Sequence, residues 1–190
     1  MTTPMSLVEE GSVVSDAVFD PTGTYRYRLS RTWAVERPIV GFVMLNPSTA
    51  DAVVDDPTIR RCIGFARRWG YGGIVVVNLF AYRATVPRIL RTVPDPVGPE
   101  NDAHLLRAQS ECERLVLAWG VHGKQGGRDR TVLELLDGGG PLDCLGVTRE
   151  GHPRHPLFLP RDVRPRPYTA VFSSAGRPTR GTSRARTEEG

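Results

Sequence analysis

Polar side chains stand at the points where the apolar runs of this sequence stop. Asn46-Pro47 follows one run, Asn78 lies near the end of a second, and His155 follows a fourth run after a turn. An asparagine amide offers both a donor and an acceptor, so Asn78 is suited to the keto-imide edge of a planar heterocycle. The imidazole of His155 is suited to stabilise negative charge on a leaving oxygen. If these side chains share one crevice, they predict a site for a heterocycle rather than for a phosphate.

Each of these residues also has a purely structural interpretation. Asn78 could satisfy the backbone of a neighbouring loop, Asn46 could form an Asx-turn before Pro47, and His155 could lie on the surface. The sequence leaves both interpretations open at all three positions.

Three carboxylates, Asp51, Asp55 and Asp56, follow the first of these motifs. An asparagine amide is not a useful base near neutral pH, so Asn46 would orient a water and one of the carboxylates could deprotonate it. Asp55 or Asp56 also precedes Pro57, which suits the first position of a helix, and a carboxylate there is a good helix cap. Helix capping is the favoured role for this pair.

The elements that must position these groups are strands alternating with helices. Continuous or alternating apolar runs predict strands at 25–33, 39–45, 74–80, 115–119 and 142–147, and amphipathic spacing predicts helices at 57–69, 99–113 and 131–137. This alternation favours an α/β fold, a three-layer sandwich around a mostly parallel central sheet of four or five strands. Ligands of such sheets collect at the carboxyl ends of the strands, where the polar residues stand.

Length and charge bound the domain organisation. A chain of 190 residues is the size of one domain, and we expect an N-terminal extension at 1–24, a single α/β domain at 25–167 and a basic, disordered tail at 168–190. The entire net charge of +4 lies within 161–190. The folded body is therefore neutral overall and has no global electrostatic attraction to nucleic acid.

Composition argues against several classes of protein. No apolar run is long enough to span a membrane, and the N-terminus lacks the pattern of a secretory signal, so we expect a cytoplasmic protein. The three cysteines are scattered and the four histidines lack metal-ligand spacing, so neither a metal site nor a cofactor is expected. We expect a monomer.

Several motifs together resemble a known family. MLNPSTAD, VVVNLFAYRAT, DPVGPENDAHL, LAWGVHG and RHPLFLP, in this order, resemble a bacterial family called domain of unknown function 1643, over about 25–167. The order of the LNP, VVVN, LAWG and His-Pro motifs is also similar, more distantly, to the uracil-DNA glycosylase superfamily. That resemblance implies a uracil-DNA glycosylase-like fold, with Asn46 positioning the attacking water, Asn78 reading the base and His155 contacting a base carbonyl. Two departures stand out: Ser48 replaces a glycine of that pattern, and Leu157 replaces a serine.

The resemblance implies an N-glycosidase that binds a flipped base and hydrolyses its N-glycosidic bond, with DNA as a partner. The residues expected to line the substrate site are Pro47, Ser48, Asn78, Phe80 and Leu157, beside the catalytic pair Asn46 and His155. Arg60, Arg61 and Arg83 are the expected phosphate contacts. Phe65, Phe80 and Tyr82 are all candidates for the ring on which the base stacks. Two alternatives stay open: an enzyme acting on a free or modified nucleotide, and a catalytically silent module that binds a base or nucleic acid.

Overall fold

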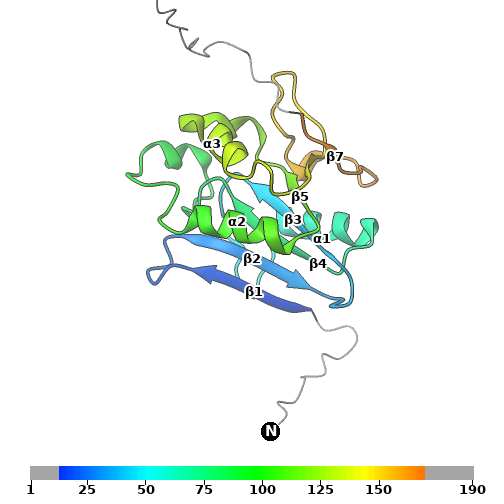
Figure 1. The fold of residues 1–190 in the computed structure, drawn as a ribbon. Coiled ribbons are helices and arrows are strands. Elements are labelled where there is room, and N and C mark those ends of the chain that lie inside the picture. The colour runs from blue at the N-terminus through cyan, green and yellow to red at the C-terminus, as the bar shows by residue number, and fades with distance from the viewer. Residues whose placement is uncertain (1–12, 170–190) are drawn as a thin grey trace, which may run out of the picture.

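Among the residues that the structure describes, seven strands form one mixed sheet in the order β1-β2-β4-β3-β5-β6-β7 (Figure 1). The structure is a computed structural model, and it describes residues 13–169. The strands are β1 (Val14–Phe19), β2 (Arg26–Thr32), β3 (Ile39–Met44), β4 (Gly73–Asn78), β5 (Arg114–Leu117), β6 (Leu142–Cys144) and β7 (Arg166–Pro167). Three neighbouring pairs, β4-β3, β3-β5 and β5-β6, are parallel, and the other three pairs are antiparallel. The α/β class is confirmed, but the prediction of a mostly parallel sheet of four or five strands is corrected to a mixed sheet of seven.

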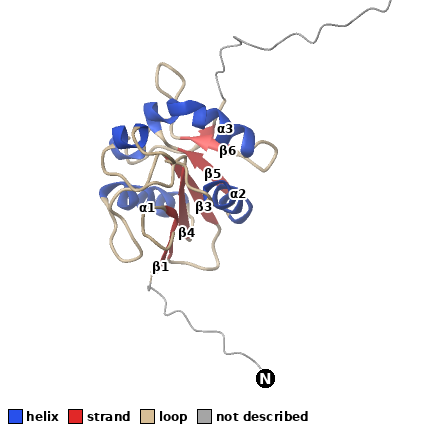
Figure 2. Ribbon diagram, turned by 90° about the vertical axis from the view of Figure 1, so that its left-hand side faces the viewer, coloured by secondary structure: helices blue, strands red, loops and turns tan. Residues whose placement is uncertain are grey.

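Helices cover both faces of the sheet (Figure 2). They are α1 (Pro57–Trp69), α2 (Asn101–Glu111) and α3 (Arg128–Leu135), with shorter 3-10 helices η1 (Pro87–Arg91), η2 (Gly120–Gly127) and η3 (Pro156–Phe158). The helix α1 packs on one face through Cys62 and Phe65, whereas α2 and α3 pack on the other through Leu105 and Val132. The sheet is therefore the middle of three layers.

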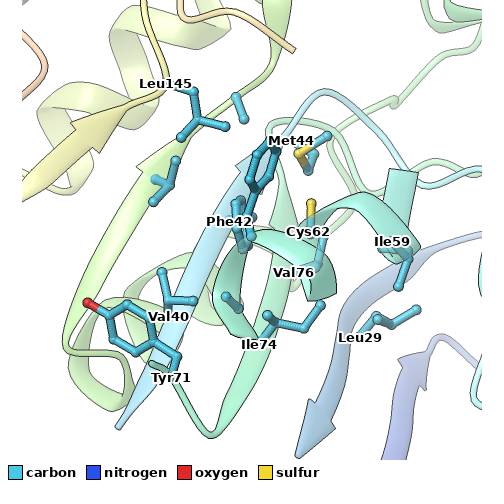
Figure 3. Close-up of a cluster of buried hydrophobic side chains, with 14 of the residues drawn as sticks. Leu29, Val40, Phe42, Met44, Ile59, Cys62, Tyr71, Ile74, Val76 and Leu145 are labelled. Atoms are coloured by element: carbon cyan, nitrogen blue, oxygen red, sulfur yellow. The ribbon is translucent and has the colours of Figure 1, made fainter. Parts of the chain in front are cut away.

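The strand β3 is buried on both faces because its alternate side chains serve different layers. Val40, Phe42 and Met44 join the cluster under α1 (Figure 3), whereas Val43 joins the cluster under α2. Successive side chains of a strand point to opposite faces, so a strand covered twice must be apolar throughout. This burial on both faces explains why the apolar run at 39–45 is unbroken.

The helix α1 begins where the sequence predicts. Asp56 is its N-cap and accepts a hydrogen bond from the backbone N–H of Ile59 at 2.8 Å, with Pro57 in the first turn. Gly70 ends the helix with φ of 90°, a left-handed conformation that glycine adopts without steric cost. The cap brings Asp56 and the first turn of α1 to the carboxyl end of the sheet.

The segment expected to be an N-terminal extension contains β1, which pairs with β2. This pairing shifts register, because Phe19 lies opposite Arg26 whereas Val18 lies opposite Arg28, so Tyr27 is an extra residue in β2. Without this bulge, Arg26 and Arg31 would point to opposite faces of the sheet. Instead, both side chains contact the 50–51 segment.

The last described residues also belong to the fold. Tyr168 donates its backbone N–H to Leu142 at 2.9 Å, and its ring meets Trp119 edge to face at 6.4 Å between centroids. The rest of the predicted tail, and the first part of the predicted extension, lie outside the described residues. Within 13–169, no helix has the length and apolar character needed to cross a bilayer. The same range contains no cluster of three or more His, Cys, Asp or Glu side chains arranged for a metal ion.

Candidate functional site

A cavity of about 460 Å³ opens at the carboxyl ends of the central strands. Its volume lies within the range of about 300–1,000 Å³ that is common for small-molecule sites. Its wall includes polar side chains from β2, from the loop after β3, from the end of β4 and from the loop before η3: Arg26, Asn46, Ser48, Asp56, Asn78 and His155. The structure therefore brings Asn46, Asn78 and His155 to one cavity, as the sequence predicted.

The amide of Asn46 has a fixed orientation. Its Nδ2 donates to the backbone oxygens of Pro47 at 2.9 Å and Ala84 at 2.7 Å. Carbonyl oxygens can only accept, so the nitrogen must face them and Oδ1 must face the other way. The side chain thus joins the loops after β3 and β4, and it keeps one acceptor that no described residue uses.

Asn78 is the last residue of β4 and is 1% exposed. Neither its Nδ2 nor its Oδ1 has a hydrogen-bond partner among the described residues. Buried polar side-chain atoms nearly always have a partner, so an asparagine with both atoms free in a cavity wall indicates a ligand that supplies them. The alternative interpretation, in which Asn78 satisfies loop backbone through its side chain, finds no hydrogen bond to support it.

That structural role belongs to Asn101 in α2. Its Nδ2 donates to the backbone oxygens of Asn78 and Leu79, each at 3.0 Å. The residue is fully buried, and only its Oδ1 lacks a partner. Asn101 therefore fixes the backbone at the end of β4 while the side chain of Asn78 stays available.

His155 is half-buried and caps η3. Its Nδ1 accepts the backbone N–H of Leu157 at 3.3 Å, so the neutral ring carries its proton on Nε2. Burial lowers the pKa of His155 below its usual 6.5, and the charge of Asp56 partly opposes this shift. Near neutral pH the residue is an uncharged donor at the cavity wall.

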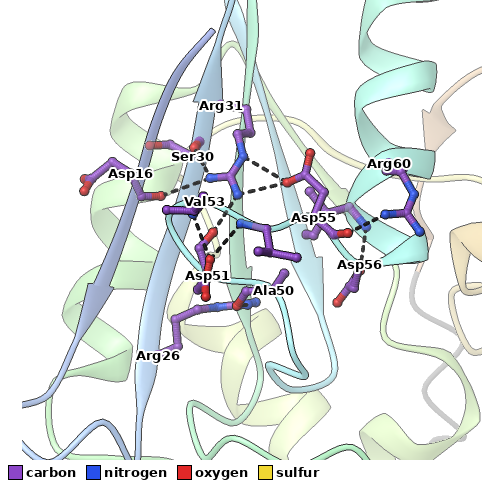
Figure 4. Close-up of polar contacts among 12 residues, drawn as sticks. Asp16, Arg26, Ser30, Arg31, Ala50, Asp51, Val53, Asp55, Asp56 and Arg60 are labelled. Atoms are coloured by element: carbon purple, nitrogen blue, oxygen red, sulfur yellow. Dashed lines mark hydrogen bonds and ion pairs between the residues drawn. The ribbon is translucent and has the colours of Figure 1, made fainter.

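The structure separates the three carboxylates. Asp51 accepts the backbone N–H groups of Val53 and Val54, each at 2.7 Å, and Asp55 pairs with Arg31 at 2.9 Å (Figure 4). Neither of them lines the cavity. Asp56 does line it while also capping α1, and only one of its oxygens is used by the cap. Helix capping and a place in the site are thus combined in one residue.

Arg26, which is 2% exposed and lines the cavity, was not among the residues predicted for the site. Its Nη1 donates to the backbone oxygen of Ala50 at 2.5 Å, and its Nε has no partner among the described residues. Its location depends on the bulge in β2, which no local pattern revealed. Burial lowers the pKa of Arg26 to about 10, so the guanidinium remains charged near neutral pH.

Other predicted substrate residues are divided between the cavity and the core. Ser48 lines the cavity, whereas Pro47, Phe80 and Leu157 do not. Phe80 is 3% exposed within the core under α2, and Pro47 serves through its backbone oxygen, which accepts from Asn46 and from the N–H of Ala84. Leu157 contributes its N–H to His155. Phe80 is therefore corrected from a site residue to a core residue.

None of the three aromatic residues considered for stacking, Phe65, Phe80 and Tyr82, lines the cavity. Two others do. Trp119 is 2% exposed and packs against Gly123, where an added Cβ would lie 2.1 Å from the indole Cδ1. Phe158 follows Leu157 and is 83% exposed at the cavity wall. Trp119 belongs to the LAWG motif, but only the packing of η2 around its ring shows that it forms part of the cavity wall.

The three arginines predicted to contact nucleic acid do not line the cavity, and each binds the protein's own backbone. Arg60 donates to Asp55, Arg61 to Leu159 and Arg83 to Gly23. Arg61 also lies over the ring of Phe65, 4.8 Å from its centroid. These contacts anchor loops around the site, so a structural role accounts for all three.

Comparison with known proteins identifies a family but no activity. Searches of curated proteins and of solved structures found no match. No uracil-DNA glycosylase is therefore among the matches, and that resemblance stays a prediction. A family model described as "protein of unknown function (DUF1643)" matches residues 26–157, from the start of β2 into η3, and these include every polar residue discussed for the cavity. The chain belongs to this family, as the motifs between Tyr25 and Pro167 predicted.

Proposed function

We propose that the protein is an N-glycosidase that binds a nucleobase in the cavity and hydrolyses the bond between the base and its sugar. One observation carries this proposal: the free acceptor of Asn46, the unpartnered amide of Asn78 and the neutral donor of His155 meet at one cavity. An amide that offers a donor beside an acceptor suits the keto-imide edge of a base. The motif order shared with the uracil-DNA glycosylase superfamily supports the same reaction.

The reaction assigns a role to each of these groups. Asn46 Oδ1 accepts a hydrogen bond from a water and aims its oxygen at the anomeric carbon of the sugar. As the new carbon–oxygen bond forms, the carbon–nitrogen bond breaks and its electron pair leaves with the base. His155 Nε2–H donates to the base oxygen on which this charge accumulates, and one such preorganised donor is worth about 3–4 kcal/mol.

Asp56 is the group that we assign to receive the proton of the water. Asn46 cannot take it near neutral pH, and Asp51 and Asp55 are engaged away from the cavity. One oxygen of Asp56 holds the helix N–H, which leaves the other for the water. This assignment extends the sequence interpretation, in which a carboxylate base was an alternative to a cap.

A free nucleotide is a second candidate substrate. It is favoured over DNA by the contacts of Arg60, Arg61 and Arg83, whose side chains donate to the protein's own backbone. The neutral charge of residues 1–160 is consistent with a small ligand as well. A silent binding module remains the alternative if no base is released.

The test is a base-release assay on the purified protein. Uracil-, hypoxanthine- and mismatch-containing oligonucleotides, single- and double-stranded, are analysed for alkali-labile abasic sites, and nucleosides and nucleotides are analysed for free base. We expect release from at least one substrate, at a rate reduced about 100-fold or more by His155→Ala. Equal rates for the wild type, Asn46→Ala and His155→Ala would refute the assigned roles.

Asp56→Asn separates the two roles of Asp56. Asparagine is as good a helix cap as aspartate but cannot accept the proton, so the melting temperature should hold while base release falls. Asp56→Ala is the matched control, because it loses both roles and should also destabilise the fold by about 1 kcal/mol. Full activity of Asp56→Asn would exclude a catalytic base at this position.

A further inference from the structure

Two arginines of β2 are buried to the same extent but differ in their partners. Arg26 and Arg31 are each 2% exposed, and both donate to the segment after Pro47 (Figure 4). Arg31 forms an ion pair with Asp55 and donates to the backbone oxygens of Ser30 and Asp51. The side chain of Arg26 makes one hydrogen bond within the described residues, to Ala50, and no ion pair with any of them. The charges of Asp56 and Asp51 favour its charged form, but neither carboxylate is in direct contact with it.

An unpaired buried charge is costly, because it has lost water without gaining a counter-charge. Nη1 of Arg26 is engaged with Ala50, but Nε and Nη2 donate to no described residue. These two groups form one edge of the guanidinium, and that edge matches the two oxygens of a carboxylate or a phosphate. Since Arg26 lines the cavity, a ligand there can supply the directly contacting counter-charge that the described residues do not.

We propose that Arg26 binds an oxyanion of the ligand through this edge, so that the substrate class is a base or nucleotide carrying a carboxylate or a phosphate. This inference rests on the cavity being the ligand site proposed above. A guanidinium that is 2% exposed is out of reach of a phosphodiester on the surface of a nucleic acid, whereas the end of a small ligand can enter the cavity. The anionic group thus belongs to a free small molecule.

The sheet order places this group beside the base-reading amide. The backbone N–H of Arg26 donates to the oxygen of Ala81 at 3.0 Å, so the start of β2 lies against the segment that follows Asn78. Neighbouring strands are about 4.8 Å apart. The strand β2, which carries Arg26, is next to β4, which ends at Asn78, whereas both β4 and β3 lie between β2 and β5, the strand that precedes Trp119. The anion therefore lies on the Asn78 side of the cavity.

Two matched pairs of ligands test the proposal: uracil against orotate, which adds a ring carboxylate, and uridine against uridine 5′-monophosphate, which adds a phosphate. Binding to the full-length protein is measured by calorimetry and by thermal shift. We expect the anionic member of at least one pair to bind about tenfold or more tightly than its neutral partner. The pair that shows the difference identifies the oxyanion. Equal affinities within both pairs, or no binding by any of the four ligands, would overturn the proposal.

Substitutions then assign the effect to Arg26. Arg26→Gln should reduce the preference for the anion to about threefold or less, and Arg26→Lys should give an intermediate value, because lysine keeps the charge but lacks the two-donor edge. Arg26→Lys also keeps the proposal testable if Arg26→Gln does not fold. Arg88→Gln is the control, since it removes an equal charge from an exposed residue next to the cavity-lining Pro87 and should leave the preference unchanged. An unchanged preference in Arg26→Gln would refute the role of Arg26.

Base release is measured separately on the same samples. Tight, Arg26-dependent binding of the anion without any release of base would refute the proposed reaction and leave the oxyanion site standing. Release of base at equal rates from neutral and anionic substrates would refute the oxyanion site and leave the proposed reaction standing.

Discussion

Replacing Asn78 by leucine should make the protein more stable while removing its ability to bind a base. The substitution is close to isosteric and eliminates two buried polar atoms that have no partner among the described residues. Leaving a buried polar group unpartnered costs about 1–3 kcal/mol, so we expect Asn78→Leu to raise the free energy of unfolding by about 2 kcal/mol. For a chain of this size, that corresponds to a rise of about 4–8 °C in melting temperature.

Asn101→Leu is the matched control, because Asn101 is also a buried asparagine and, from α2, contacts the end of β4. Its Nδ2 donates to the backbone oxygens of Asn78 and Leu79, and leucine would leave these acceptors without that donor. We therefore expect Asn101→Leu to lower the free energy of unfolding by about 1–3 kcal/mol. The opposite signs distinguish a side chain held for a ligand from one that holds the fold.

The assay is thermal unfolding of both variants at the same pH, followed by ligand binding and base release for Asn78→Leu. If Asn78→Leu melts as far below the wild type as Asn101→Leu does, the Asn78 amide stabilises the fold and is not held for a ligand. Retained base binding by a stable Asn78→Leu would refute the base-reading role.

Three further predictions concern the surroundings of the site. Because burial lowers the pKa of His155, the unfolded chain binds more protons than the folded chain below pH 6.5, so the free energy of unfolding should decrease as the pH falls through this window. His155→Gln should weaken this pH dependence in denaturant titrations between pH 5 and 7. An unchanged pH dependence in His155→Gln would contradict the prediction. Gly123→Ala should destabilise the protein by about 1–3 kcal/mol in thermal melts, because its Cβ would overlap Trp119, whereas Gly64→Ala within α1 should stabilise it by about 0.5–1 kcal/mol. Burial raises the pKa of the Cys62 thiol and brings that of Cys112 to about 12, so neither should react with a thiol reagent at pH 8 until the chain is unfolded, and rapid labelling of the native protein would refute their burial.

Local sequence patterns were sufficient to predict those elements whose residue types are set within a single strand or helix. The apolar runs that became β3 and β4 are continuous because each strand is covered on both faces, and Asp56-Pro57 marks the start of α1 because cap and first turn have strong local preferences. Since parallel strands end at the same edge of a sheet, the positions of Asn46 and Asn78 after two such runs also predicted that they would meet.

The sequence by itself thus determined the α/β class, the core strands, the first helix and the shared location of two amides and an imidazole. Only the tertiary structure decided which of these polar groups are free. The amide nitrogen of Asn46 is held by Ala84 from a distant loop, which leaves its oxygen free, whereas no described segment brings a partner to either polar atom of Asn78. The local cap uses one oxygen of Asp56, and the fold places this residue in the cavity wall. It also decided the place of Arg26, which reaches the cavity through one extra residue in the pairing of β1 with β2. Periodicity reports which face a side chain takes within one element, whereas a hydrogen-bond partner or a shift in register depends on two segments at once, and no single stretch of sequence contains both.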